Sequence, residues 1–254
     1  MSAGTSDIAG KVALITGASR GLGRAIACGL AREGVTVALA ARTKASLESV
    51  RREILEAGGQ ALAIPTDITD SAAVSDLVEA TVDGLGRIDI LVNNSGVLRS
   101  APLLQMKTEE WDEVFSTNLR GMFILTRAVG KHMTARASGK IINIASNFAF
   151  LGVPNHTAYC ASKAAVVSLT KSLAIEWAGF NVQVNAIAPG YFETEMTAEA
   201  RNDAAVYARI LKSLPTRRMG TPEEIVPWVT LLASSASNYI TGETLVIDGG
   251  QSAR

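Results

Sequence analysis

A tyrosine and a lysine four residues apart, Tyr159 and Lys163, are the residues whose types and spacing point most directly to chemistry. On a helix this spacing places both side chains on one face. A free phenol has a pKa of about 10 and is a poor base at neutral pH, but a neighbouring ammonium favours the phenolate. We therefore predict that Lys163 lowers the pKa of Tyr159 and makes it a general acid and base.

A serine directly follows an apolar run, Lys140–Ala145, that we predict to be a strand. Open parallel sheets bind ligands at the carboxyl ends of their strands, so the Ser146 hydroxyl is placed to hold a substrate oxygen. Taken alone, Ser146 could be a helix cap and Tyr159 an amphipathic surface residue. With Lys163 they predict a proton-transfer site.

The segment Thr16–Gly23 has a glycine-rich sequence, TGASRGLG, between a predicted strand and a predicted helix. Glycine permits tight turning, and a helix N-terminus offers free N–H groups and a positive dipole end to a pyrophosphate. The spacing is GxxxGxG and departs from the general GxGxxG, whose third glycine would fall at Ile26. Alone, this could be a structural turn. Beside a proton-transfer site it predicts dinucleotide binding.

These residues need a scaffold, and seven apolar, β-rich runs alternate with six longer helical patterns. The predicted strands are Lys11–Thr16, Val35–Ala40, Ala61–Pro65, Ile88–Val92, Lys140–Ala145, Asn181–Ala188 and Glu243–Ile247. The predicted helices are Leu22–Glu33, Lys44–Ala57, Ser71–Leu85, Thr108–Arg136, Ala158–Ala178 and Pro222–Ser234. The alternation predicts an α/β, doubly wound, Rossmann-type fold with seven parallel strands and helices on both faces. We expect a short N-terminal extension, 1–10, and one domain over 11–254.

The helix–strand rhythm changes over residues 190–215, which we predict to be a lid over the substrate pocket; a surface helix would fit the pattern equally well. The lid and the segment after Ser146 carry apolar residues that indicate a partly apolar pocket, although they could equally be core. They are Tyr191, Phe192, Met196, Tyr207, Asn147, Phe148, Phe150 and Leu151.

Composition excludes several classes of protein. Hydrophobic residues make up 48% and charged residues 19% of the 254, and 24 basic residues balance 24 acidic ones. No basic run suggests nucleic acid, and no stretch reaches the ~18 apolar residues of a membrane span. Cys28 and Cys160 are far apart and form no CxxC pair, so we expect neither disulfide nor metal. With no secretory signal, we expect a cytoplasmic location.

The sequence resembles the short-chain dehydrogenase/reductase family from about Lys11 to Gly250. The shared motifs occur in the family's order: the turn Thr16–Gly23, Asn93-Asn94-Ser95-Gly96, Asn118, Ser146, Tyr159–Lys163 and Pro189-Gly190. Ser95 departs from the alanine more common in the family, and we expect it to be structural.

The resemblance implies roles for the residues that match. Tyr159 would be the general acid in ketone reduction and the general base in alcohol oxidation, Ser146 would orient the carbonyl, and Asn118 would hold a water of the proton relay. Lys163 would also bind the nicotinamide ribose. The predicted cofactor site comprises Gly17, Ser19, Arg20, Gly21, Leu22, Gly23, Arg42, Asp67, Ile68, Asn94, Tyr159, Lys163, Pro189, Gly190 and Thr194.

Within that set, Asp67 would bind the adenine edge or, alternatively, cap a helix. Asn94 would support the cofactor side, Ile187–Gly190 would face the nicotinamide, and Thr194 would bind its carboxamide or a phosphate.

The end of the second predicted strand reads Ala40-Ala41-Arg42-Thr43, without the carboxylate that usually binds the ribose hydroxyls of NAD. Arg42 and Arg20 are near the place of a 2′-phosphate, so NADP(H) is favoured over NAD(H). Arg42 could otherwise be a solvated strand end.

The resemblance extends to two groups of relatives, the 3-oxoacyl-acyl-carrier-protein reductases and the gluconate and related sugar-acid dehydrogenases. We expect a small carbonyl or alcohol substrate, with the reductase as the first interpretation and the dehydrogenase as the alternative. Arg99 or Arg209 could bind an anionic group of either substrate. A catalytically silent cofactor sensor or scaffold is the alternative of another class.

Family members are commonly homotetramers. The small residues Ala158, Ala161, Ala164 and Ala165 would permit close helix packing within or between subunits.

Overall fold

The protein is built on one sheet of seven parallel strands in the order β3-β2-β1-β4-β5-β6-β7. A computed structural model describes residues 7–253. The strands are β1 Val12–Thr16, β2 Thr36–Ala41, β3 Ala61–Pro65, β4 Ile90–Asn93, β5 Gly139–Ile144, β6 Val182–Pro189 and β7 Thr244–Ile247. The predicted doubly wound, Rossmann-type fold is therefore confirmed, and the predicted strands differ from these by one or two residues at their ends.

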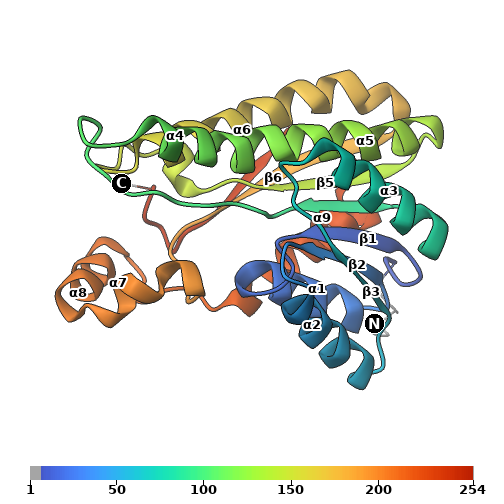
Figure 1. Cartoon of the computed structure of the whole chain (residues 1–254), viewed down its shortest axis with the longest axis horizontal. Coiled ribbons are helices and arrows are strands. Elements are labelled where there is room, and N and C mark those ends of the chain that lie inside the picture. The colour runs from blue at the N-terminus through green and yellow to red at the C-terminus, as the bar shows by residue number, and fades with distance from the viewer. Residues whose placement is uncertain (1–6, 254) are drawn as a thin grey trace.

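Helices cover both faces of the sheet (Figure 1). One layer contains α1 Gly21–Arg32, α2 Lys44–Glu56 and α9 Val226–Ala233, and the other contains α3 Ser71–Leu85, α4 Thr108–Phe115, α5 Met122–Ala135 and α6 Thr157–Trp177. Large apolar side chains fill the space between each layer and the sheet, such as Leu30 on one face and Leu77 on the other. Burial on both faces explains why the central strands read as continuous apolar runs.

The predicted helix Thr108–Arg136 is interrupted. A π-helical segment, Ser116–Gly121, separates α4 from α5. At Gly121 an added Cβ would lie 2.9 Å from the side chain of Ile68, so only glycine allows this close approach. The prediction Pro222–Ser234 likewise begins as a 3-10 turn, Pro222–Ile225, before α9.

Residues 190–215 contain a 3-10 turn, Glu195–Thr197, and two short helices, α7 Ala198–Asn202 and α8 Ala204–Ser213. These helices form a lobe beside the main body, at the lower left of Figure 1. The lobe has its own small cluster of buried side chains, Ile210, Leu214 and Met219.

Of the predicted N-terminal extension, residues 1–6 lie outside the described residues. Residues 7–10 pack on the domain, because Ile8 is fully buried and Gly10 N donates to Gly34 O. Within the described residues, no helix has the length and apolarity needed to cross a membrane.

Candidate active site

Tyr159 and Ser146 meet at the carboxyl end of the sheet. Tyr159 lies in the first turn of α6, and Ser146 lies two residues beyond β5. Both side chains are buried, with 8% and 7% of their surface exposed, and Ser146 is close enough to the phenol to lower its pKa. The Ser146 hydroxyl accepts from the N–H of Phe148 at 3.2 Å. The fold thus brings the two residues together at one buried place.

Lys163 lies one turn further along α6, only 3% exposed. Its Nζ donates to the carbonyl oxygen of Ile144 at 2.7 Å and lies 5.7 Å from the centroid of the Tyr159 ring. Burial lowers the pKa of Lys163 to about 8. The ammonium is therefore fixed at the end of β5, beside the tyrosine, and is close to losing its proton at mildly alkaline pH.

The pKa of Tyr159 differs from our prediction. We expected Lys163 to lower it, but burial raises it to about 12, against a smaller lowering by the Ser146 hydrogen bond. Desolvation disfavours the phenolate more than these neighbours stabilise it. At neutral pH the tyrosine therefore keeps its proton, as a general acid must.

Asn118 belongs to the π-helical segment and is fully buried. Its Nδ2 donates to Val97 O at 3.0 Å and to Ser162 Oγ at 3.1 Å, and its Oδ1 accepts from Val97 N at 2.8 Å. A Cβ added at Gly96 would lie 3.4 Å from Asn118 Oδ1 and 3.5 Å from Lys163 Nζ, so the two side chains border the same place. Single π-helical turns are frequent at functional sites.

Asn94 forms hydrogen bonds with the backbone of the glycine-rich turn between β1 and α1. Its Nδ2 donates to Thr16 O at 2.9 Å and to Gly17 O at 3.2 Å. A Cβ at Gly23 would lie 2.2 Å from Gly17 O, so this position needs glycine. Arg20 is the N-cap residue of α1, and among the described residues its side chain makes no capping hydrogen bond. The first backbone N–H groups of α1 are therefore available to bind the diphosphate of a cofactor.

Comparison with known proteins agrees with this geometry. A family model described as enoyl-(acyl carrier protein) reductase matches residues 17–252. The 3-oxoacyl-acyl-carrier-protein reductase of Thermotoga maritima is 42% identical over 241 residues, which are 95% of this chain and 97% of the relative. The chain belongs to the short-chain dehydrogenase/reductase family. It is an oxidoreductase that acts on a CH–OH group with NAD(P).

Relatives with another substrate match this short-chain dehydrogenase/reductase equally well. Gluconate 5-dehydrogenase of Gluconobacter oxydans is 42% identical over 244 residues, 96% of this chain and 95% of the relative. The crystal structure of a gluconate 5-dehydrogenase from Burkholderia cenocepacia in complex with NADP and tartrate has a TM-score of 0.94 and 37% identity. It covers 98% of this chain and 99% of its own.

The remaining cofactor residues predicted for the short-chain dehydrogenase/reductase lie around the same edge of the sheet. Asp67 is exposed and accepts from both the N–H and the hydroxyl of Thr69, while Asp70 is the N-cap of α3. Asp67 is therefore not that helix's cap. The hydrogen bonds from Thr69 and, more weakly, the charge of Arg42 lower the pKa of Asp67, so the Arg42 side chain lies near this carboxylate. Ile68 is 7% exposed and packs in the core, so only its backbone is available to a cofactor.

The nicotinamide side of the predicted site lies where β6 ends at Pro189-Gly190 and the lid begins. A Cβ at Gly21 would lie 3.4 Å from Thr194 Cβ and 3.3 Å from Glu195 Oε2. The start of the lid therefore touches the glycine-rich turn. Glu195 was absent from our predicted site, because no motif marks a carboxylate that approaches α1 through the fold.

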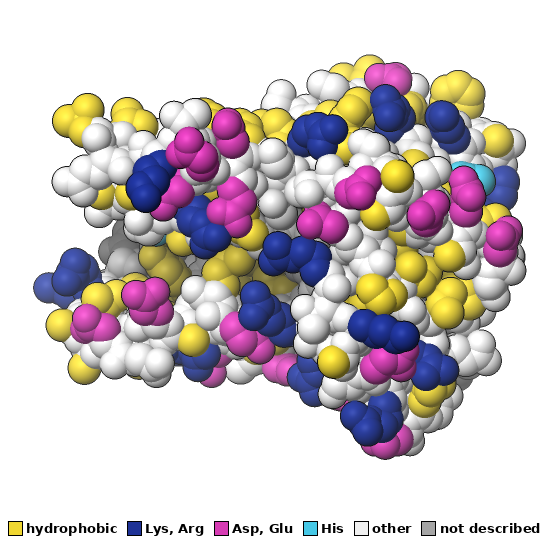
Figure 2. Space-filling view, viewed as in Figure 1, with side chains coloured by type: hydrophobic (Ala, Val, Ile, Leu, Met, Phe, Trp, Pro, Cys, Tyr) yellow, Lys and Arg dark blue, Asp and Glu magenta, His cyan; other side chains and the backbone are white. Residues whose placement is uncertain are grey.

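The aromatic residues we assigned to a pocket or the core separate into two groups. Phe148 packs edge to face with Tyr159 and with Tyr191 of the lid, at centroid distances of 6.0 and 5.9 Å. Phe192 is 5% exposed and belongs to the core, whereas Phe150 and Met196 are about half exposed. Figure 2 shows a hollow between the α7–α8 lobe and the main body, with apolar side chains inside and basic ones around its mouth.

The predicted anion partner Arg99 is already paired. Its guanidinium forms two 2.8 Å hydrogen bonds with the Glu113 carboxylate, so its charge is largely neutralised. Arg209 is exposed on α8. Sequence reasoning missed a further arginine, Arg201, which lies in the predicted lid. Its guanidinium donates to Thr194 O at 3.0 Å, and its buried Nε has no partner among the described residues.

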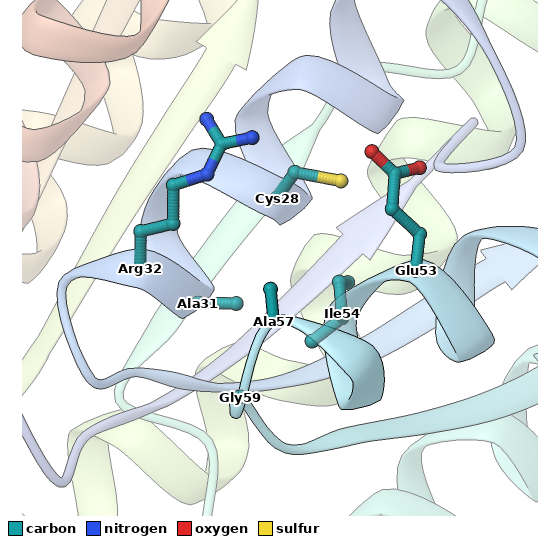
Figure 3. A pocket seen from close by; sticks show the side chains of 7 residues that line it. All are labelled: Cys28, Ala31, Arg32, Glu53, Ile54, Ala57 and Gly59. Carbon is teal, nitrogen blue, oxygen red and sulfur yellow. The ribbon is translucent and has the colours of Figure 1, made fainter.

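A small cavity of about 20 Å³ between α1 and α2 is separate from this site. Figure 3 shows the Cys28 thiol and the Glu53 carboxylate turned toward each other across it. Burial raises the pKa of Cys28, so the thiol is a poor nucleophile. In the described part of the chain, no cluster of three or more His, Cys, Asp or Glu side chains could hold a metal ion.

Proposed function

We propose that this short-chain dehydrogenase/reductase reduces a ketone to a secondary alcohol with NADPH and catalyses the reverse oxidation. The observation that carries the proposal is the buried, neighbouring pair of Ser146 and Tyr159, in which the tyrosine pKa is about 12. A phenol that stays protonated at neutral pH can donate to a carbonyl oxygen as that oxygen gains charge. Ser146 would hold the same oxygen.

Each buried polar residue then has one task. Tyr159 would release its proton to the substrate oxygen, and Lys163, fixed at Ile144 O, would stabilise the phenolate that remains. Asn118, whose side chain is fully engaged with Val97 and Ser162, would hold a water that returns the proton. The cofactor would supply the hydride from its nicotinamide ring.

NADP(H) is our preferred cofactor over NAD(H). Arg20 and Arg42 are exposed, and among the described residues neither forms an ion pair. Two free guanidinium groups beside the glycine-rich turn suit a 2′-phosphate. The preference predicts that Arg42→Ala raises the KM for NADPH about tenfold and leaves that for NADH unchanged. Arg52→Ala, an exposed change on α2, is the control. Equal KM values for NADPH before and after the change would contradict the choice.

The first substrate candidate is a 3-oxoacyl thioester. An acyl chain needs apolar surface, and Met196 of the predicted lid and Phe150 of the segment after Ser146 are half exposed. The pairing of Arg99 with Glu113 also leaves that arginine little charge for a free carboxylate.

The second candidate is a keto sugar acid. It is favoured by the unpartnered Nε of Arg201, a lid cation that a carboxylate could satisfy.

The proposal is tested by turnover with NADPH of an acetoacetyl thioester, a 5-ketogluconate and a simple ketone. Preference for the thioester supports the first candidate. Preference for the ketogluconate that is lost in Arg201→Met supports the second. If NADPH binds tightly and none of the ketones is reduced, the protein is a silent cofactor sensor or scaffold. The intact set of Ser146, Tyr159 and Lys163 argues against that outcome.

We also propose that the chain forms homo-oligomers, up to a tetramer. β7 is an edge strand, and large apolar side chains are exposed near it and on the long helices: Val246, Trp228 and Tyr239, and Phe123 and Ile175. Exposed apolar side chains of this kind suit contact with a second copy of the chain. The alanines of α6 are divided, with Ala158 buried and Ala161 and Ala164 exposed. Light scattering of the purified protein measures the number of subunits.

A further inference from the structure

A turn, Asp248-Gly249-Gly250-Gln251, follows β7 and packs beside Ser146. The Asp248 carboxylate is 9% exposed and accepts from Gly250 N at 3.0 Å and Ser252 N at 2.8 Å. It also accepts from Asn147 Nδ2 at 3.2 Å. These hydrogen bonds keep the pKa of Asp248 below its usual value despite burial. A buried, ionised carboxylate therefore faces the residue after Ser146.

Asn147 is the other half of this contact and is 1% exposed. Its Nδ2 donates both to Asp248 and to Gln251 Oε1, the latter at 2.9 Å. An ionised carboxylate only accepts, so the Asn147 amide must present its nitrogen to the turn. Its Oδ1 is left buried without a partner among the described residues. A buried polar atom left unsatisfied is costly, which indicates that the orientation of Asn147 is imposed by the turn.

The same turn reaches the lid and the end of β6. Gln251 Nε2 donates to Ser213 Oγ, at the end of α8, at 3.3 Å. Thr216 N, just beyond the lid, donates to Gly249 O at 3.4 Å. A Cβ at Gly190 would lie 2.6 Å from Asp248 Cβ. The turn thus contacts three parts of the proposed site. They are the catalytic loop, defined here as Ser146 and Asn147, the predicted nicotinamide side at Gly190, and the C-terminal end of the predicted lid.

We propose that Asn147 and Asp248 are positioning residues whose hydrogen bond fixes the end of the lid relative to Ser146. Closure of the lid over a substrate would then be transmitted through Gln251 and Asn147 to the catalytic loop. The expected effect of this hydrogen bond on turnover rests on the proposed function, whereas its expected effect on the lid does not.

The test reverses the polarity of the hydrogen bond. Asn147→Asp puts two carboxylates face to face, and Asp248→Asn leaves one acceptor oxygen for three donors, whereas the double variant restores one donor and one acceptor between the two side chains. We expect each single change to lower kcat/KM at least about tenfold, through kcat, and the double variant to recover most of that loss. In Asn147→Asp, activity should also recover at acidic pH, where the two carboxylates share a proton. Asp83→Asn, the same change at an exposed position of α3, is the control.

A second readout does not need the reaction. Trypsin cleavage at the lid residues Arg201 and Arg209 should be about tenfold faster in each single variant and in Gln251→Met, and near the wild-type rate in the double variant. If the wild type reduces no ketone, the proposed function fails and the cleavage rates alone decide this inference. Unchanged cleavage and kcat/KM in the single variants would overturn it. So would a folded double variant as impaired as either single variant. If a variant at position 147 or 248 does not fold, Gln251→Met decides, with wild-type cleavage as the contrary result.

Discussion

The proposed catalytic wall, defined here as Asn118, Ser146, Tyr159 and Lys163, and the predicted lid, residues 190–215, differ in how the fold holds them. Each wall residue is at most 8% exposed; hydrogen bonds hold Asn118, Ser146 and Lys163, and Tyr159 packs against Phe148. The lid contributes only Ile210 and Leu214 to a small buried apolar cluster with Met219, and Met196 is 53% exposed.

This difference teaches where chemistry and specificity reside. Groups that transfer protons need fixed distances, and the wall provides them on β5, α6 and the π-helical segment. Few buried contacts make a segment easy to open, and the lid has few. We therefore expect changes in the wall to impair every substrate and changes in the lid to distinguish among substrates.

The largest effect should come from Lys163→Met, apart from the tyrosine change described last. Loss of the ammonium removes the charge that stabilises the phenolate, so kcat should fall about 10²–10⁴-fold for every ketone tested. Lys171→Met, an exposed lysine two turns further along α6, should leave kcat unchanged. A loss confined to one substrate would show that Lys163 acts in specificity and would remove the contrast with the lid.

The pH dependence should identify the same residue. Because the pKa of Lys163 is about 8, the lysine is charged below that pH and neutral above it. Ketone reduction should therefore be constant from pH 6 to about 7.5 and decline as the pH rises past about 8. Reduction that increases steadily from pH 7 to 10 would contradict this assignment.

A lid change should give a smaller and selective effect. Met196→Ala removes exposed apolar surface of the predicted lid, so the KM for an acetoacetyl thioester should rise up to about tenfold. The kcat and the KM for a small ketone should change less than about twofold. Glu199→Gln on α7 is the matched control. Equal losses for both substrates would mean that the lid and the wall are not separable.

The smallest effect concerns Glu195, whose carboxylate approaches the N-terminus of α1 at Gly21. Glu195→Gln removes a charge that would repel the cofactor diphosphate, so the Kd for NADPH should fall about two- to fivefold at low salt. Titration by NADPH fluorescence measures this change. Weaker binding in the variant would show that the carboxylate supports the cofactor site.

The sheet, its order of elements and the glycine-rich turn could be predicted because each is coded by local pattern. Tyr159 and Lys163 share a helix face through their spacing alone. The direction of the Tyr159 pKa could not be predicted, because it depends on burial by Phe148 and its neighbours, which the fold decides.

Long-range partners were equally hidden. Arg99 looked available until the fold placed Glu113 beside it, and the π-helical turn at Asn118 looked like continuous helix. Asn147 and Asp248 are 101 residues apart and meet only because β5 and β7 both flank β6. Local patterns carry no information on such pairs.

The most direct test of the account is Tyr159→Phe, measured by single-turnover oxidation of NADPH with the preferred ketone. The ring and its packing on Phe148 remain, so the melting temperature and NADPH affinity should be unchanged, while the rate should fall at least about 10²-fold. Tyr207→Phe in the lid should keep the wild-type rate. A Tyr159→Phe enzyme that reduces the ketone at the wild-type rate would contradict the central claim.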